Sequence, residues 1–173
     1  MPEQISSTPQ VKSFRVGLAF VIATACGAGF FPKAPGTMGT LVAMPLAYML
    51  RNEPDVFRAG FWIILIVIGT WAAKVFDEVM KTNDNQNIVI DEVIGLGISS
   101  WTAGDDMKAW VLAFILFRIF DVLKPFPVRN IDRWSKKQAS AWWKGFGVIA
   151  DDIVAAFQAL AVMVALQHWH VLL

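Results

Sequence analysis

The segment around which this sequence is organised is Phe117-Arg118-Ile119-Phe120-Asp121-Val122-Leu123-Lys124-Pro125-Phe126-Pro127-Val128-Arg129-Asn130-Ile131-Asp132-Arg133. We expect an apolar helix to run directly into it from the N-terminal side. Arg118, Asp121 and Lys124 follow at three-residue steps, so they share one face of that helix. The two prolines then end the helix, because proline has no amide donor. Charges are costly in an apolar environment, so the cluster predicts a functional site, although a simple ion pair between Arg118 and Asp121 would also account for it.

The composition indicates a membrane protein of one domain. Of its 173 residues, 56% are hydrophobic and 17% are charged, against roughly 45–50% and 25% in ordinary soluble domains. The mean hydropathy is +0.52. The net charge of +1 gives no indication of a nucleic-acid partner. We expect residues 1–13 to form a polar N-terminal tail and residues 14–173 to form a single helical domain.

The hydrophobic pattern predicts an all-α fold: a compact, membrane-embedded bundle of about six helices, several of them short or interrupted. The expected helices are 14–31, 37–50, 59–76, 93–101, 107–123 and 148–167. Segment 59–76 approaches the ~20 residues that cross about 30 Å of hydrocarbon. Small residues in segment 14–31 predict close packing against another helix. Thr37 is suited to cap the helix that begins beside it, and an aspartate of the turn Gly104-Asp105-Asp106 is suited to cap the next one. Residues 132–147 are expected to form a basic loop.

Four polar clusters are expected to emerge on one side of the bundle: Lys33 to Thr40, Asp84 to Glu92, Arg118 to Arg133, and Asp151-Asp152. If each helix crosses the membrane once, two helices separate the first cluster from the second and two separate the second from the third. No helix separates the third from the fourth. Ten of the fifteen basic residues also fall on this side, and the positive-inside tendency then places it in the cytoplasm. The ten are Lys33, Lys74, Lys81, Arg118, Lys124, Arg129, Arg133, Lys136, Lys137 and Lys144.

The residues in these clusters are suited to phosphoryl chemistry. The carboxylates are Asp84, Asp91, Glu92, Asp121, Asp151 and Asp152. Crowded carboxylates repel one another unless a cation sits among them, and oxygen-only ligands suit Mg²⁺, Mn²⁺ or Ca²⁺. The facing cations are Arg118, Lys124, Arg129 and Arg133, and a guanidinium group matches phosphate oxygens. A helix that begins near Gly36 and Thr37, just after Lys33, would also favour an anion at its free amides.

Several other phosphatase mechanisms are excluded by what the sequence lacks. The two histidines lie at the far end of the last expected helix, which argues against a phosphohistidine. Cys26, expected in mid-helix, is not followed by a C-x5-R loop, and there is no D-x-D-x-[TV] motif. No GK[ST] follows the glycines near Gly36, which excludes a nucleoside-triphosphate loop. Two mechanisms remain open: water activated by a metal and a carboxylate, or attack by an aspartate.

Four motifs together resemble the phosphatidylglycerophosphatase A family, in the family's order and spacing. They are Pro35-Gly36-Thr37-Met38-Gly39; Ile88-Val89-Ile90-Asp91-Glu92 with Gly95; Phe117-Arg118-Ile119-Phe120-Asp121 with Lys124-Pro125; and Gly147 followed by Asp151-Asp152-Ile153. The resemblance runs from about Leu18 to Ala165. The sequence departs from the family pattern after Asp84, where Asn85 stands in place of a glycine or proline.

This resemblance implies Mg²⁺-dependent hydrolysis of phosphatidylglycerophosphate to phosphatidylglycerol and inorganic phosphate, in phospholipid biosynthesis. It also implies a multi-pass protein of the bacterial inner membrane, with its active site facing the cytoplasm. The partners expected are the phospholipid substrate and the membrane, with no nucleic acid; the oligomeric state stays open. The loop with Trp134, Trp142 and Trp143 would then rest on the membrane surface beside the lipid entrance, unless its tryptophans simply pack on the bundle.

The site residues expected on this basis fall into three groups. The catalytic group is Asp91, Asp121, Asp151, Arg118 and Lys124, of which Arg118 and Lys124 would hold the phosphate. The substrate-binding group is Lys33, Gly36, Thr37, Arg129 and Arg133. The metal-binding group is Asp84, Asp91, Glu92, Asp151 and Asp152. The alternative is a non-enzymatic, transporter-like membrane protein whose intramembrane charges line an ion path. A CDP-alcohol phosphotransferase is disfavoured because its D-G-x2-A-R motif is absent.

Overall fold

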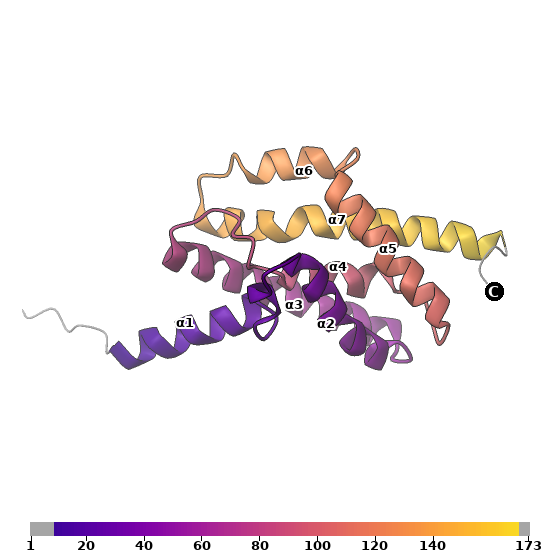
Figure 1. The fold of residues 1–173 in the computed structure, drawn as a ribbon, viewed down its shortest axis with the longest axis horizontal. Helices are drawn as coiled ribbons and strands as arrows, with labels where there is room; N and C mark the ends of the chain where they lie inside the picture. Colours follow the sequence, from indigo (N-terminus) through magenta and orange to yellow (C-terminus); the bar gives the residue numbers. More distant parts are fainter. Residues whose placement is uncertain (1–8, 170–173) are drawn as a thin grey trace, which may run out of the picture.

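The computed structural model of the protein describes residues 9–169, with side chains from residue 13 onward. Across these residues the chain forms helices and no strands, which confirms the predicted all-α fold class (Figure 1). The elements are α1 (Pro9–Ala23), a 3-10 helix η1 (Ala28–Phe30), α2 (Pro35–Leu50), α3 (Asp55–Met80), α4 (Ile90–Ser99), α5 (Met107–Leu123), α6 (Val128–Ser135) and α7 (Ala141–His168). Residues 1–8 of the expected N-terminal tail, and His170, lie outside the described residues.

The short helix α4 lies at the centre of the bundle, where it packs against α2, α3, α5 and α7. All of its residues except Glu92 are buried. The ring of Phe117 lies so close that a Cβ at Gly95 would be 2.2 Å from it, so a glycine is needed at this crossing. With 10 residues and a rise of about 1.5 Å per residue, α4 is too short to cross a bilayer.

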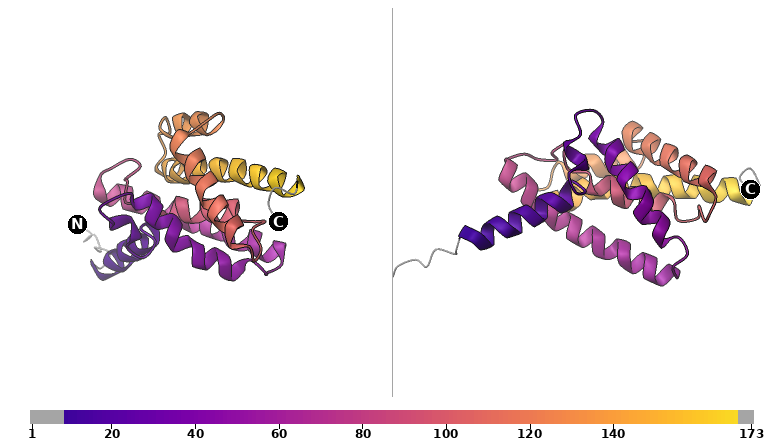
Figure 2. Two further views of the ribbon diagram at one scale, coloured as in Figure 1. Left: turned by 45° about the vertical axis from the view of Figure 1, so that its right-hand side comes forward. Right: turned by 60° about the horizontal axis from the view of Figure 1, so that its bottom comes forward.

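The two long helices α3 and α7 run along the length of the molecule (Figures 1 and 2). Each is long and apolar enough to cross a membrane, judged by length and composition: 26 residues in α3 and 28 in α7. Figure 2 shows that α1 extends away from the rest of the bundle at one end. Helix α4 cannot cross alone, but the segment after it reaches the start of α3, where Arg58 donates to the carbonyl of Trp101. That each helix crosses the membrane once stays a prediction.

The first apolar segment, 14–31, is not one helix as predicted. Helix α1 ends at Ala23, and the chain then turns through Ala25, Cys26 and Gly27, all with positive φ. A left-handed backbone cannot continue an α-helix. Cys26 therefore lies exposed in this turn and not in mid-helix. The predicted packing is met only in part: α1 packs on α3, but several of its large apolar side chains are exposed, namely Phe14, Leu18 and Val21.

Residues 132–147 do not form the predicted basic loop. They contain the end of α6 and the start of α7, and only residues 136–140 connect the two. Helix α6 has eight residues, too few to be stable alone, so its packing on α7 explains why it forms. Edge-to-face contacts join Trp134 to Trp143 and Trp143 to Phe146, with ring centroids 6.1 and 5.9 Å apart.

The two predicted helix caps differ in outcome. An aspartate caps α5 as predicted: it is Asp106, whose side chain accepts a hydrogen bond from the amide of Lys108. Thr37 does not cap α2, because the helix begins two residues earlier. Ala34, in the left-handed conformation, is the N-cap, and Pro35 opens the helix. Proline is favoured there because the first helical amide needs no partner.

Candidate active site

Three carboxylates meet where α4 begins beside the middle of α7. Asp91 and Glu92 lie in the first turn of α4, and Asp152 projects from α7. One oxygen from each lies within 4.8 Å of the other two. Asp91 and Asp152 are buried, and the Glu92 side chain is only 13% exposed. Three anions this close repel one another strongly in a medium of low dielectric constant. We refer to Asp91, Glu92 and Asp152 as the carboxylate cluster.

Two buried oxygens of the carboxylate cluster have no hydrogen-bond partner among the described residues. They are Glu92 Oε2 and Asp152 Oδ2. A buried anionic oxygen without a partner carries a desolvation cost of more than about 1–3 kcal/mol. A divalent cation would offset that cost for both atoms. The donors are all carboxylate oxygens, which suit Mg²⁺, Mn²⁺ or Ca²⁺, so the residues present fit a metal ion of this kind.

Arg118 connects the carboxylate cluster to α5. Its Nη1 lies 2.7 Å from Asp121 Oδ2 and 3.5 Å from Glu92 Oε1. The ion pair that the helical spacing indicated is therefore formed. Nη1 nevertheless makes no well-directed hydrogen bond to either carboxylate. Nη1 is itself buried, beside the carboxylates of Asp121 and Glu92.

The start of α2 lies against Glu92 and Arg118. It can come this close because residue 36 is glycine. A Cβ at Gly36 would lie 2.0 Å from Glu92 Oε1 and 3.1 Å from Arg118 Nη1. The amides in the first turn of a helix lack intrahelical partners and favour negative charge. Gly36 is buried and Thr37 is partly buried. The start of α2 thus adds a region suited to anions beside Arg118.

A second charged group lies next to the carboxylate cluster, along α7. Lys124, in the left-handed conformation at the end of α5, places its Nζ 2.6 Å from Asp132 Oδ1 and 2.6 Å from Asp151 Oδ2. Lys136 donates to the other oxygen of Asp132 at 2.9 Å. Partial burial alone would lower the pKa of Lys124, but its hydrogen bonds to the two carboxylates raise that pKa above its usual value. We refer to Lys124, Asp132 and Asp151 as the lysine triad.

No role is predicted for Asp132 from the sequence. The one feature of the sequence that could have indicated a role is its position among the charged residues that follow Pro125 and Pro127. Burial would raise the pKa of Asp132, but hydrogen bonds from Lys124 and Lys136 lower it below the usual range. Asp132 is therefore an ionised partner of Lys124, held on α6.

Four predicted site residues are not brought into either group. Asp84 is exposed in the loop after α3, where its amide donates to Asp77 Oδ2 at 2.8 Å. Lys33, Arg129 and Arg133 are exposed, and none of them makes an ion pair within residues 13–169. Their roles in metal or substrate binding stay predictions. Asp77, also unpredicted, is buried and fixes this loop by accepting further bonds from Thr82 and Asn85.

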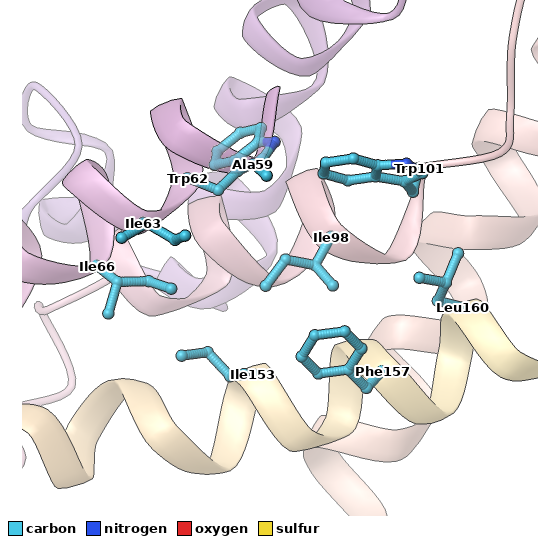
Figure 3. A pocket seen from close by; sticks show the side chains of 9 residues that line it. All are labelled: Ala59, Trp62, Ile63, Ile66, Ile98, Trp101, Ile153, Phe157 and Leu160. Atoms are coloured by element: carbon cyan, nitrogen blue, oxygen red, sulfur yellow. The ribbon is translucent and has the colours of Figure 1, made fainter. Parts of the chain in front are cut away.

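The four polar clusters of the sequence do converge, because the start of α2, the start of α4, the end of α5 and the middle of α7 meet. Asp151 lies in the lysine triad and not in the carboxylate cluster, so only three of the five predicted metal ligands lie together. An apolar groove of about 350 Å³ lies elsewhere, between α3, α4 and α7. Figure 3 shows Ile153 and Phe157 facing Ile66 and Ile98 across it, with no charged side chain in the lining.

Comparison with known proteins identifies the family of this chain. The sequence model of the family described as phosphatidylglycerophosphatase A matches residues 21–167. Phosphatidylglycerophosphatase A of Haemophilus influenzae is 33% identical over 151 residues, which cover 86% of this chain and 88% of that protein. Its namesake in Escherichia coli is 32% identical over 151 residues, covering 86% and 84%.

A third relative carries a different name. A Bacteroides thetaiotaomicron protein named as a candidate phosphatidylinositol-3-phosphatase is 31% identical over 160 residues, covering 88% of this chain and 94% of that protein. No solved structure gives a significant match. The family match spans most of the chain and includes every residue of the carboxylate cluster and the lysine triad. The chain therefore belongs to the phosphatidylglycerophosphatase A family, a family of phosphatase enzymes.

Proposed function

We propose that this protein hydrolyses the phosphate monoester of phosphatidylglycerophosphate, giving phosphatidylglycerol and inorganic phosphate, with Mg²⁺ as cofactor. The observation that carries the proposal is the carboxylate cluster, with its two unpartnered oxygens, beside Arg118 and the start of α2. Acidic oxygens for a metal and donors for a phosphate are the two parts that phosphoryl chemistry requires. The printed names of two relatives support the choice of lipid.

The metal would be held by Asp91, Glu92 and Asp152. When bound, Mg²⁺ supplies a Lewis acid that polarises a phosphate oxygen and makes a bound water more acidic. This assignment leaves Asp151 to the lysine triad, where Lys124 already balances its charge. Asp84 is exposed in a loop, and we do not include it among the proposed metal ligands.

The phosphate would be held by Arg118, the first-turn amides of α2, and Lys124. Asp121 contacts Arg118 and keeps its guanidinium group at the carboxylate cluster. Gly36 lets the α2 backbone approach Glu92 and Arg118 closely. Arginine binds a phosphate through two parallel N–H groups, and its positive charge stabilises the extra negative charge that develops in the transition state.

We also propose that the protein is a multi-pass protein of the bacterial inner membrane, with the site at the depth of the lipid headgroups on the cytoplasmic side. The length and composition of α3 and α7 support membrane crossing. The excess of basic residues in the segments near the site supports the orientation. A lipid phosphatase needs its site at this depth, because the phosphate stays attached to two acyl chains.

The test is phosphate release by purified protein in mixed micelles that contain phosphatidylglycerophosphate. We expect release that requires Mg²⁺, stops with a chelator and returns when Mg²⁺ is added back. Phosphatidylinositol-3-phosphate is the comparison substrate, because one relative is named for it, and we expect slower release from that lipid. If folded protein releases no phosphate from either lipid but carries ions across proteoliposomes, the transporter alternative is correct.

A further inference from the structure

The lysine triad contains one carboxylate, Asp132, that comes from α6 and has no role in the proposed function. Both of its oxygens are engaged, Oδ1 by Lys124 at 2.6 Å and Oδ2 by Lys136 at 2.9 Å. The Asp132 side chain is 14% exposed, whereas Lys136 is 54% exposed. Asp132 thus faces into the protein, toward Lys124, from a helix that is otherwise largely exposed.

We propose that Asp132 is a positioning residue, which orients the Lys124 ammonium group so that one N–H remains directed to the substrate phosphate. This inference rests on the proposed phosphatase function. An ammonium group has three donors. Asp132 accepts one and Asp151 accepts another, each at 2.6 Å. With two donors fixed on carboxylates from two helices, the direction of the third is fixed as well.

The need for such a residue follows from the flexibility of lysine. A lysine side chain has four rotatable bonds. Holding it in one conformation costs up to about 2 kcal/mol in side-chain conformational entropy. One partner on α7 would leave the ammonium group free to rotate about the contact with Asp151. The second partner on α6 removes that freedom before the lipid binds, which is the kind of preorganisation that improves binding.

Helix α6 is held in place by contacts that do not involve Asp132. A Cβ at Gly147 would lie 2.4 Å from Ser135 Cβ, so α6 and α7 touch closely there. Gln158 on α7 also donates to the carbonyl of Phe126, just before α6, at 2.9 Å. Val128, at the start of α6, is fully buried. Loss of the Asp132 charge should therefore leave α6 docked and affect Lys124 selectively.

The test compares Asp132→Asn with Asp105→Asn. Asp105 pairs with Arg51 in a different part of the bundle. The control therefore makes the same chemical change, and like Asp132→Asn it removes an aspartate from an ion pair. We expect Asp132→Asn to raise the KM for phosphatidylglycerophosphate about tenfold, with a melting temperature close to that of the unchanged protein. We expect Asp105→Asn to leave KM unchanged, and Asp132→Glu to restore most of the lost affinity. A merely structural role would lower the folded fraction, and with it the apparent kcat, at constant KM.

A second measurement does not depend on activity. Acetic anhydride modifies free lysine amines, and mass spectrometry reports the rate at Lys124. We expect Lys124 to react several-fold faster in Asp132→Asn than in the unchanged protein, and no faster in Asp105→Asn. Equal KM and equal labelling in Asp132→Asn would overturn the inference, even if phosphate release itself is confirmed. If the unchanged protein releases no phosphate, the proposed function fails, and the labelling rate still decides whether Asp132 orients Lys124.

Discussion

The carboxylate cluster and the lysine triad are neighbouring groups of acidic residues that differ in how their negative charge is compensated. In the lysine triad, Lys124 contacts both acids at 2.6 Å. In the carboxylate cluster, three acids lie within 4.8 Å, and two of their buried oxygens accept no hydrogen bond. Of the three acids in the cluster, Arg118 contacts only Glu92, at 3.5 Å. The comparison shows that the acids of the lysine triad are paired within the chain, whereas the carboxylate cluster keeps buried oxygens without a partner; the proposed metal ion would bind there.

The largest expected effect comes from removing one acid of the carboxylate cluster. Asp152→Asn should reduce phosphate release by about a thousandfold or more, because the metal loses a charged ligand and its position changes. Mg²⁺ should raise the melting temperature of the unchanged protein, since a ligand that binds only the folded state stabilises it. It should not do so in Asp152→Asn. A normal Mg²⁺-induced shift in this variant would show that Asp152 is not a ligand.

Arg118→Lys tests the phosphate side of the carboxylate cluster. We expect a loss of about a hundredfold in kcat/KM, because one ammonium group cannot replace the two-pronged contact of a guanidinium group. The Mg²⁺-induced rise in melting temperature should remain, since Arg118 is not a metal ligand. If turnover is unchanged in the folded variant, another group must hold the phosphate.

Gly36→Ala tests how close α2 must come to the carboxylate cluster. The new methyl group would lie 2.0 Å from Glu92 Oε1, so Glu92 or α2 must move. We expect kcat/KM to fall about thirtyfold, since a displacement of 1 Å at a site costs up to a hundredfold. The matched control is Gly17→Ala in α1, where a Cβ meets nothing within 4 Å. That control should keep full activity and gain up to about 1 kcal/mol of stability; equal losses in both variants would contradict the assignment.

The smallest effect is expected from the tryptophans at the start of α7. Trp142 and Trp143 are 43% and 49% exposed, and such rings favour the depth of the headgroups. Replacing both with alanine should reduce hydrolysis of long-chain lipid in bilayers roughly fivefold, a loss of about 1 kcal/mol. Hydrolysis of a short, water-soluble analogue should be spared. Equal loss on both substrates would mean that these tryptophans support the fold, for example through the contact of Trp143 with Trp134.

Much of the site could be predicted because it depends on local spacing. Arg118 and Asp121 are three residues apart on one helix, and they pair as that spacing requires. Asp91 and Glu92 were expected at the start of an apolar helix, and they lie in the first turn of α4. Helix α6 was missed because an eight-residue helix depends on the surface of α7, which local sequence does not describe.

Composition and a period of 3.6 residues are enough to predict the helical fold, the polar residues at the helix ends and the face shared by Arg118 and Asp121. Which acids lie in the carboxylate cluster and which pair with Lys124 depends on how the helices pack. Asp151 and Asp152 are adjacent in sequence, yet successive residues on a helix point about 100° apart. Asp151 therefore meets Lys124, whereas Asp152 meets Asp91 and Glu92. That division depends on how α4, α5 and α6 are placed around α7, and no local pattern in the sequence specifies their placement.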